Sequence, residues 1–104
     1  MAKVYGNWCG SNWTDGRKIS ARDYLLSGGD FKGACIDNLD CACRDHDKDC
    51  SSEKGCSAKA DRKLASVARD VLNNPFDRLF RPTKYGAAAI ILPGITAASL
   101  FRQR

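Results

Sequence analysis

Apolar residues recur with helical spacing in the middle of the chain. The positions i, i+3, i+4, i+7 and i+8 hold Leu64, Val67, Ala68, Val71 and Leu72. This spacing is typical of a helix with one buried face. It predicts a helix over residues 57–73, which ends where the Asn-Asn-Pro sequence of residues 73–75 disfavours continuation.

A second helix is predicted over residues 37–50, which contain no Gly or Pro. Asp37 is a favourable N-cap, and Asp40 lies three residues later, where a carboxylate complements the helix dipole. One stripe of this helix holds Leu39, Cys43, His46 and Cys50. The histidine, which is the only one in the chain, is therefore expected on a face that cysteines fix to the rest of the fold.

The remaining segments are shorter or less regular. Residues 5–16 are rich in turn-forming residues and predict an irregular loop, residues 20–26 a short helix, and residues 50–56 a tight turn. The apolar run 86–101 is expected to break at Pro93-Gly94, and it is too short on either side to span a membrane, which takes ~20 residues. This run either packs in the core or inserts at a membrane interface.

Six cysteines in 104 residues indicate disulfides and an oxidising compartment, because a small domain often needs covalent support. The sequence alone allows ~15 complete pairings. A zinc module is the alternative, but the cysteine spacings include no C-x2-C pair and there is no second histidine.

Charge is distributed unevenly along the chain, whose formal net charge is +5. Residues 37–50 are rich in aspartate, whereas residues 75–104 are basic. This pattern fits a cation site within a protein that approaches an anionic surface. Nucleic acid is not expected as a partner, because the aromatic residues do not alternate with the basic ones as a stacking platform requires. No apolar leader follows Met1, which fits a mature or excised domain.

His46, Asp47 and Asp61 carry the candidate chemistry. A neutral imidazole beside a carboxylate offers a general base and a cation ligand together. Asp61 lies on the N-terminal extension of the apolar stripe of residues 57–73 and needs a partner if it is buried. The obvious partner is the single imidazole. Each residue also has a non-catalytic interpretation. His46 would be a structural residue, Asp47 a surface charge, and Asp61 a carboxylate that compensates the dipole of its helix.

Three motifs in order give a specific resemblance to the secreted phospholipases A2. Residues 5–10 (YGNWCG) resemble the Y-G-x-x-C-G calcium loop of that family, and residues 42–47 (ACRDHD) resemble its C-C-x-x-H-D active-site helix. Residues 37–40 (DNLD) and 60–65 (ADRKLA) resemble two further family motifs, D-x-L-D and C-D-x-x-x-A. The resemblance covers roughly residues 5–72. The short connection between His46 and Asp61 matches compact members that lack a β-wing.

The resemblance implies a fold class and one disulfide. The fold is expected to be mainly α, with two antiparallel disulfide-supported helices and an N-terminal calcium-binding loop, in one domain over residues 1–104. Its catalytic core would span about 5–74, followed by a basic and apolar tail over 75–104. The family bridge between loop and helix is retained as Cys9–Cys43. Cys50–Cys56 and Cys35–Cys41 then follow by proximity and elimination.

The resemblance also implies the site. His46 would activate water and Asp61 would orient the imidazole. Ca²⁺ would be held by the Asp47 carboxylate and by the backbone carbonyls of Trp8, Gly10 and Asn12, while the Gly10 amide would stabilise the oxyanion. Cys50 occupies the position where many members have a tyrosine bonded to the catalytic aspartate.

The function implied is calcium-dependent hydrolysis of the sn-2 acyl ester of glycerophospholipids, which releases fatty acid and lysophospholipid. The expected partner is a phospholipid membrane surface that is anionic. The expected location is extracellular (secreted) or virion-associated. Two alternatives stay open. The first is a non-catalytic, membrane-binding or toxin-like relative, and the second is a cysteine-stapled structural module of a viral or bacterial protein.

Overall fold

The computed structural model describes residues 3–104. Met1, the residue at which the sequence shows no apolar leader, lies outside the described residues. The chain is mainly helical, as expected. Its elements are β1 (Lys3–Tyr5), β2 (Cys9–Gly10), α1 (Ala21–Leu26), α2 (Asn38–Cys50), α3 (Ala58–Leu72), α4 (Pro75–Phe80) and α5 (Pro82–Ser99).

The helix boundaries follow from local capping chemistry. The side chains of Ser20, Asp37 and Ser57 accept hydrogen bonds from backbone amides in the first turns of α1, α2 and α3. These interactions satisfy donors that have no partner inside the helix. The predicted ranges for all three helices therefore agree with the structure to within a residue at each end.

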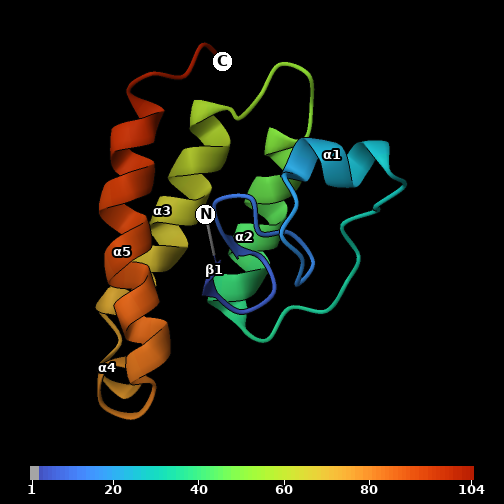
Figure 1. The fold of residues 1–104 in the computed structure, drawn as a ribbon. Coiled ribbons are helices and arrows are strands. Elements are labelled where there is room, and N and C mark those ends of the chain that lie inside the picture. The colour runs from blue at the N-terminus through green and yellow to red at the C-terminus, as the bar shows by residue number, and fades with distance from the viewer. Residues whose placement is uncertain (1–2) are drawn as a thin grey trace.

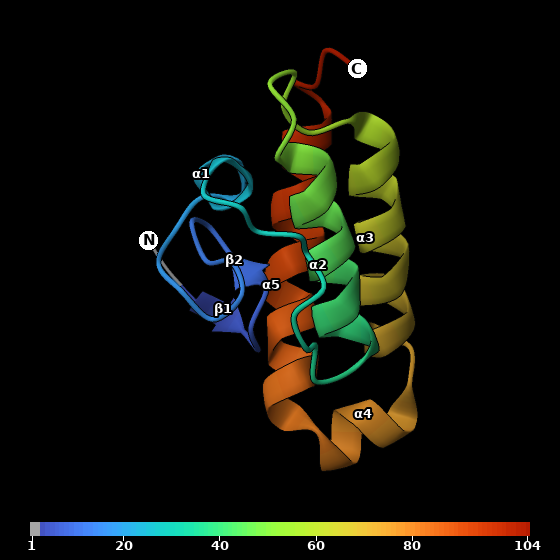
Figure 2. The same cartoon turned by 90° about the vertical axis from the view of Figure 1, so that its right-hand side faces the viewer.

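Three long helices form the body of the molecule. α2 and α3 lie side by side and run in opposite directions, and α5 packs along α3, as Figures 1 and 2 show. Ala68, Ala87 and Ala88 are all buried, and their small side chains let α3 and α5 approach closely. α5 packs against α3 more extensively than α2 does.

The course of α5 corrects one expectation from the sequence. The apolar run was expected to break at Pro93-Gly94, but the helix continues through both residues to Ser99. Proline removes one backbone donor and strains the preceding turn. Here the surrounding Ala- and Ile-rich turns pack against the core, and their burial outweighs that local cost. No helix in the described chain is long and apolar enough to cross a membrane.

The N-terminal segment corrects a second expectation. Residues 5–16 are not wholly irregular, because β1 and β2 form a two-stranded antiparallel sheet that pairs Tyr5 with Cys9. Trp8, in the turn between the two strands, belongs to an aromatic cluster. Its ring lies edge-on to that of Tyr24, with centroids 5.8 Å apart, and close to that of Phe31. Trp8 is fully buried, so it belongs to the core.

Three disulfides connect these parts, and they are the pairs that the sequence analysis expected. The pairs are Cys9–Cys43, Cys35–Cys41 and Cys50–Cys56. The first links β2 to α2, and the other two each close a short loop at one end of α2. Such a set is compatible with an extracellular protein.

Candidate functional site

His46 and Asp61 form a close pair between α2 and α3. The Nε2 atom of His46 lies 2.6 Å from Oδ1 of Asp61, well within the ~4 Å reach of a hydrogen bond or ion pair. The side chains are 10% and 1% exposed. Asp61 is placed in the first turn of α3 by the Ser57 cap, and the opposed directions of α2 and α3 bring it to the imidazole.

Asp61 has a further partner, Arg102, that no pattern in the sequence indicated. Arg102, beyond the end of α5, donates from Nε to Oδ2 at 2.6 Å and from its terminal nitrogen to Oδ1 at 3.1 Å. The C-terminal segment is held there by Arg104, whose carbonyl accepts from the Ala58 amide. The tail is therefore part of this candidate site, whereas from the sequence it was expected to follow a catalytic core over about residues 5–74.

These contacts keep Asp61 ionised. Burial by itself would raise the pKa of Asp61, but hydrogen bonds from Arg102 and His46 hold it below its ordinary value. An ionised carboxylate accepts hydrogen bonds, so the Nε2 atom of His46 carries the proton in this pair. A neutral imidazole then has an unprotonated Nδ1, which is the nitrogen able to accept a proton.

Asp47 lies one residue further along α2 and faces a cavity of about 570 Å³. Among the described residues, its Oδ2 is a buried side-chain oxygen without a hydrogen-bond partner. Burial, with a smaller contribution from the charge of Asp40, raises the pKa of Asp47 to about 8. A buried, unpartnered carboxylate oxygen suits a hard cation, because it costs free energy unless it is compensated.

The other residues expected to bind Ca²⁺ line the same cavity. They are Trp8, Gly10 and Asn12. The backbone of Gly10 and of Asn12 has positive φ, 141° and 52°, which turns the chain sharply at this point. Glycine adopts such angles freely and asparagine tolerates the left-handed region.

Asp40 holds this loop against α2. Its carboxylate accepts hydrogen bonds from the amides of Asn7, Trp8 and Ile36, at 2.9–3.1 Å. Gly6 lies so close that a Cβ there would be 2.4 Å from the carboxylate carbon of Asp40. From the sequence, Asp40 was expected to complement the helix dipole. In the structure it also positions the backbone of residues 7–8.

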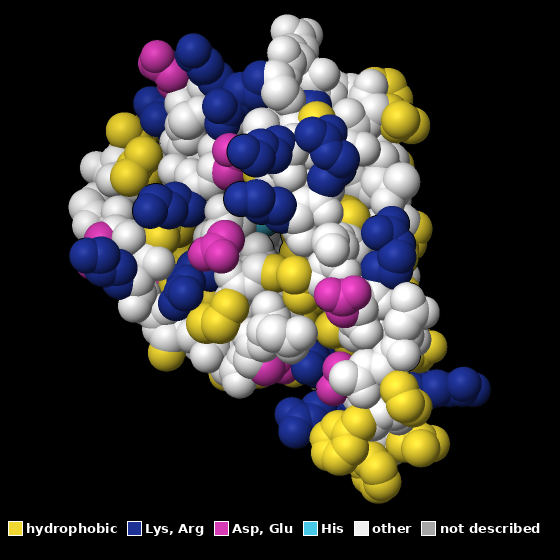
Figure 3. Space-filling view, turned by 180° about the vertical axis from the view of Figure 1, so that it is seen from behind, with side chains coloured by type: hydrophobic (Ala, Val, Ile, Leu, Met, Phe, Trp, Pro, Cys, Tyr) yellow, Lys and Arg dark blue, Asp and Glu magenta, His cyan; other side chains and the backbone are white. Residues whose placement is uncertain are grey.

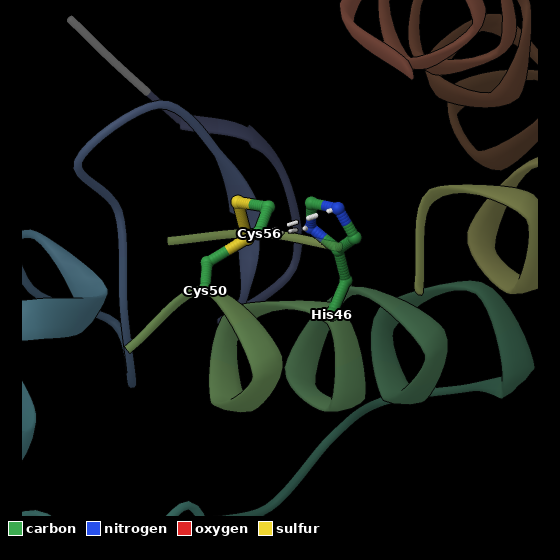
Figure 4. A group of neighbouring side chains, drawn as sticks. All are labelled: His46, Cys50 and Cys56. Atoms are coloured by element: carbon green, nitrogen blue, oxygen red, sulfur yellow. Dashed lines mark hydrogen bonds between the residues drawn. A yellow bond between two sulfur atoms is a disulfide. The ribbon is translucent and has the colours of Figure 1, made fainter. Parts of the chain in front are cut away.

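The Cys50–Cys56 disulfide lies beside the imidazole, as Figure 4 shows. The sulfur of Cys50 is 3.6 Å from Nδ1 of His46. The three side chains are close enough to suggest a metal site. However, metals bind thiolates, and both sulfurs are used in the disulfide. This arrangement does not fit a His-Cys-Cys zinc site.

α5 forms an apolar wall of the same cavity. The residues of α5 that line it are Ile90, Ile91, Gly94 and Ile95. His46 and Asp47 line the same cavity, so the imidazole and the carboxylate share a space with aliphatic side chains. The cavity can therefore accept a ligand that has a polar end and a hydrocarbon end.

His46 also lines a second hollow, between the outer faces of α2 and α3. Its rim carries Lys48, Lys59 and Lys63, and basic side chains are numerous on this face in Figure 3. Ala42, Asp49, Ala60 and Val67 also line this hollow.

Comparisons with known proteins add nothing to this picture: no protein-family model, curated protein or solved structure matches the chain.

Proposed function

We propose that this protein is a calcium-dependent phospholipase A2 that hydrolyses the sn-2 ester of glycerophospholipids. The observation that carries the proposal is the pairing of His46 with a buried, ionised Asp61 beside a cavity that also holds the unpartnered Oδ2 of Asp47. A structural histidine would not need an adjacent buried carboxylate without a partner, because such a group destabilises the fold.

The residues of the chain divide the reaction between them. Asp61 holds the Nε2 proton of His46, so that Nδ1 accepts a proton from a water molecule as the oxygen attacks the ester carbonyl. Asp61 also stabilises the imidazolium that forms. The imidazolium then returns the proton to the departing alkoxide oxygen when the ester bond breaks, which gives a fatty acid and a lysophospholipid.

The Asp47 carboxylate and the carbonyls of Trp8, Gly10 and Asn12 would hold Ca²⁺. The donor set fits this ion, since carboxylate and carbonyl oxygens are hard ligands, and these residues line one cavity with the unpartnered Oδ2 of Asp47. When bound, Ca²⁺ supplies Lewis-acid polarisation of the substrate carbonyl and charge neutralisation of its phosphate. The Gly10 amide is the proposed backbone donor to the oxyanion.

The apolar wall provided by α5 supports an acyl substrate. Ile91 and Ile95 recur at i and i+4 on the helix and line the cavity with Gly94. An aliphatic chain is the ligand that such a surface binds best. This wall is what distinguishes the proposed substrate from a small polar ester.

The test is fatty-acid release from mixed phospholipid vesicles in calcium and in a chelator. The wild-type protein is expected to release fatty acid in calcium only, and the His46→Gln variant is expected to be inactive in both conditions. Release that persists in chelator would exclude the calcium mechanism. No release under either condition, from protein with intact disulfides, would favour a non-catalytic membrane-binding or structural module.

A further inference from the structure

The short helix α4 exposes its apolar residues. Phe76, Leu79 and Phe80 are 53%, 71% and 69% exposed. They lie at i, i+3 and i+4, so they share one face of the helix. The Phe76 and Phe80 rings are 5.0 Å apart, and the three side chains form a continuous apolar tip, which projects from one end of the molecule in Figure 3.

The opposite face of α4 contacts the body of the protein through a polar residue. Asp77 is 4% exposed, and its Oδ1 lies 3.1 Å from Nζ of the buried Lys84 on α5. The helix start is fixed by the Asn74 side chain, which accepts from the amides of Phe76 and Asp77. α4 is therefore inverted relative to an ordinary surface helix, which buries its apolar face.

The charges around the tip are of one sign. Arg78 and Arg81 are exposed, and the guanidinium of Arg81 lies over the Phe76 ring at 5.2 Å. Asp77 supplies the opposing charge. It is buried and pairs with Lys84 at 3.1 Å and, at 3.8 Å, with Arg81, whose side chain is half exposed. The exposed surface of α4 is thus apolar at its tip and cationic at its edge.

We propose that the α4 tip docks on an anionic phospholipid surface. Aromatic and aliphatic side chains with flanking arginines match the hydrocarbon boundary and the phosphate layer of such a surface. A protein partner would need a larger area than one six-residue helix offers. This docking surface stands independently of the proposed catalysis, and both would act at the same kind of membrane.

Sedimentation with phospholipid vesicles in chelator tests the docking surface, because no hydrolysis is expected there. The wild-type protein is expected to bind vesicles that contain phosphatidylglycerol more tightly than vesicles of phosphatidylcholine alone. The Leu79→Ser/Phe80→Ser variant should bind both about tenfold more weakly or worse. The matched control is Leu26→Ser, since Leu26 is 67% exposed on α1, and it should bind as the wild type does.

The charged edge is tested separately. Arg78→Gln/Arg81→Gln should lose the preference for phosphatidylglycerol, whereas Lys18→Gln/Lys32→Gln, which removes two other exposed cations, should keep most of it. Unchanged vesicle binding by both α4 variants would overturn the proposal. So would the finding, by analytical ultracentrifugation, that Leu79→Ser/Phe80→Ser dissociates a dimer while vesicle binding persists.

The outcome does not depend on whether the protein is an enzyme. Vesicle binding without fatty-acid release in calcium would support the docking surface and contradict the proposed catalysis. Hydrolysis of a soluble short-chain ester, with vesicle binding that the α4 variants do not change, would support catalysis and contradict the docking surface.

Discussion

Asp47 gives the site a pH dependence that can be measured without substrate. The pKa of Asp47 in the folded protein is raised to about 8, whereas the pKa of an aspartate in an unfolded chain is about 4. The folded protein therefore holds this proton more tightly. The stability that Asp47 contributes is fully present below about pH 4 and is lost as the pH rises to about 8. In chelator, the melting temperature of the wild type should fall across this range.

The Asp47→Asn variant is the control, because it cannot ionise. We expect it to remove most of the fall in melting temperature between about pH 4 and pH 8. Asp61 does not obscure the result, since its lowered pKa gives stability that is lost only at lower pH. Equal slopes for the two proteins would show that Asp47 is not held protonated by burial.

Three substitutions separate the base from the metal ligand. His46→Gln should abolish detectable turnover, a loss of at least about 10²–10⁴-fold, and leave calcium binding nearly unchanged. Asp47→Asn should lose both, because it removes the charged ligand. Asp61→Asn should reduce turnover less, through a misoriented imidazole. Vesicle hydrolysis and calcium calorimetry give the two readouts, with a wild-type Kd expected near ~10⁻⁴–10⁻³ M.

The assignment fails if the pattern is reversed. Wild-type calcium affinity in Asp47→Asn, with loss of affinity in His46→Gln, would place the imidazole among the metal ligands. Submicromolar affinity in the wild type would also contradict a site with one protein carboxylate.

Arg102 should act as a positioning residue for Asp61. Arg102→Gln leaves a buried carboxylate with one partner fewer, and we expect it to cost about 1–3 kcal/mol of stability and to lower kcat with little change in KM. Arg102→Lys should restore part of kcat. Arg104→Gln is the matched control, since Arg104 also pairs with an aspartate but is more exposed. Equal effects of Arg102→Gln and Arg104→Gln on kcat would assign Arg102 a merely structural role.

At the scale of single residues, the sequence could predict two kinds of feature. These are contacts between residues close together in the chain, and the role of a residue type that occurs only once. The capping roles of Asp37 and Ser57 are local, and a chain with one histidine offers one imidazole to a buried Asp61. The contact between Arg102 and Asp61 spans 41 residues. No periodicity or local spacing of residues in the sequence encodes this contact.

α5 should control acyl-chain length through Gly94. This residue lines the cavity, and a Cβ built on it meets no atom within 4 Å. Gly94→Trp should therefore fill the space without disturbing the packing, and it should slow the release of long acyl chains more than that of short ones. Fatty-acid release from a series of esters of increasing chain length measures the effect.

Gly86→Trp provides the comparison for this substitution. Gly86 is also within α5, and a Cβ there likewise meets nothing within 4 Å, but it does not line the cavity. Both substitutions replace a helical glycine and should retain the helix. A parallel change in chain-length preference for the two variants would remove α5 from the acyl-binding wall.

The helices were predictable to different degrees. α2 and α3 have clear caps, a periodic apolar stripe and end signals, so their bounds follow from the sequence. α5 has apolar residues around its whole circumference, so it shows no single stripe, and its internal Pro93-Gly94 pair predicted a break. Its continuity depends on packing against α3, a tertiary interaction that the one-dimensional pattern does not contain.

At the scale of the whole molecule, the three disulfides are unequal in the constraint they place on the unfolded chain. Cys9–Cys43 joins residues 34 apart, whereas Cys35–Cys41 and Cys50–Cys56 each join residues 6 apart. In the loop-entropy account, the long bridge stabilises by about 4 kcal/mol and each short one by about 2 kcal/mol. The long bridge also links β2 to α2, which carry the two sides of the proposed calcium site.

Replacing both cysteines of one bridge by serine avoids a free thiol and tests this ranking. Cys9→Ser/Cys43→Ser should lower the free energy of unfolding in guanidinium by about twice as much as Cys35→Ser/Cys41→Ser does. It should also weaken calcium binding, because the loop that carries Gly10 and Asn12 is no longer fixed to the helix that carries Asp47. Equal losses of stability with unchanged calcium affinity would mean that Asp40 and the aromatic cluster position the loop without the bridge.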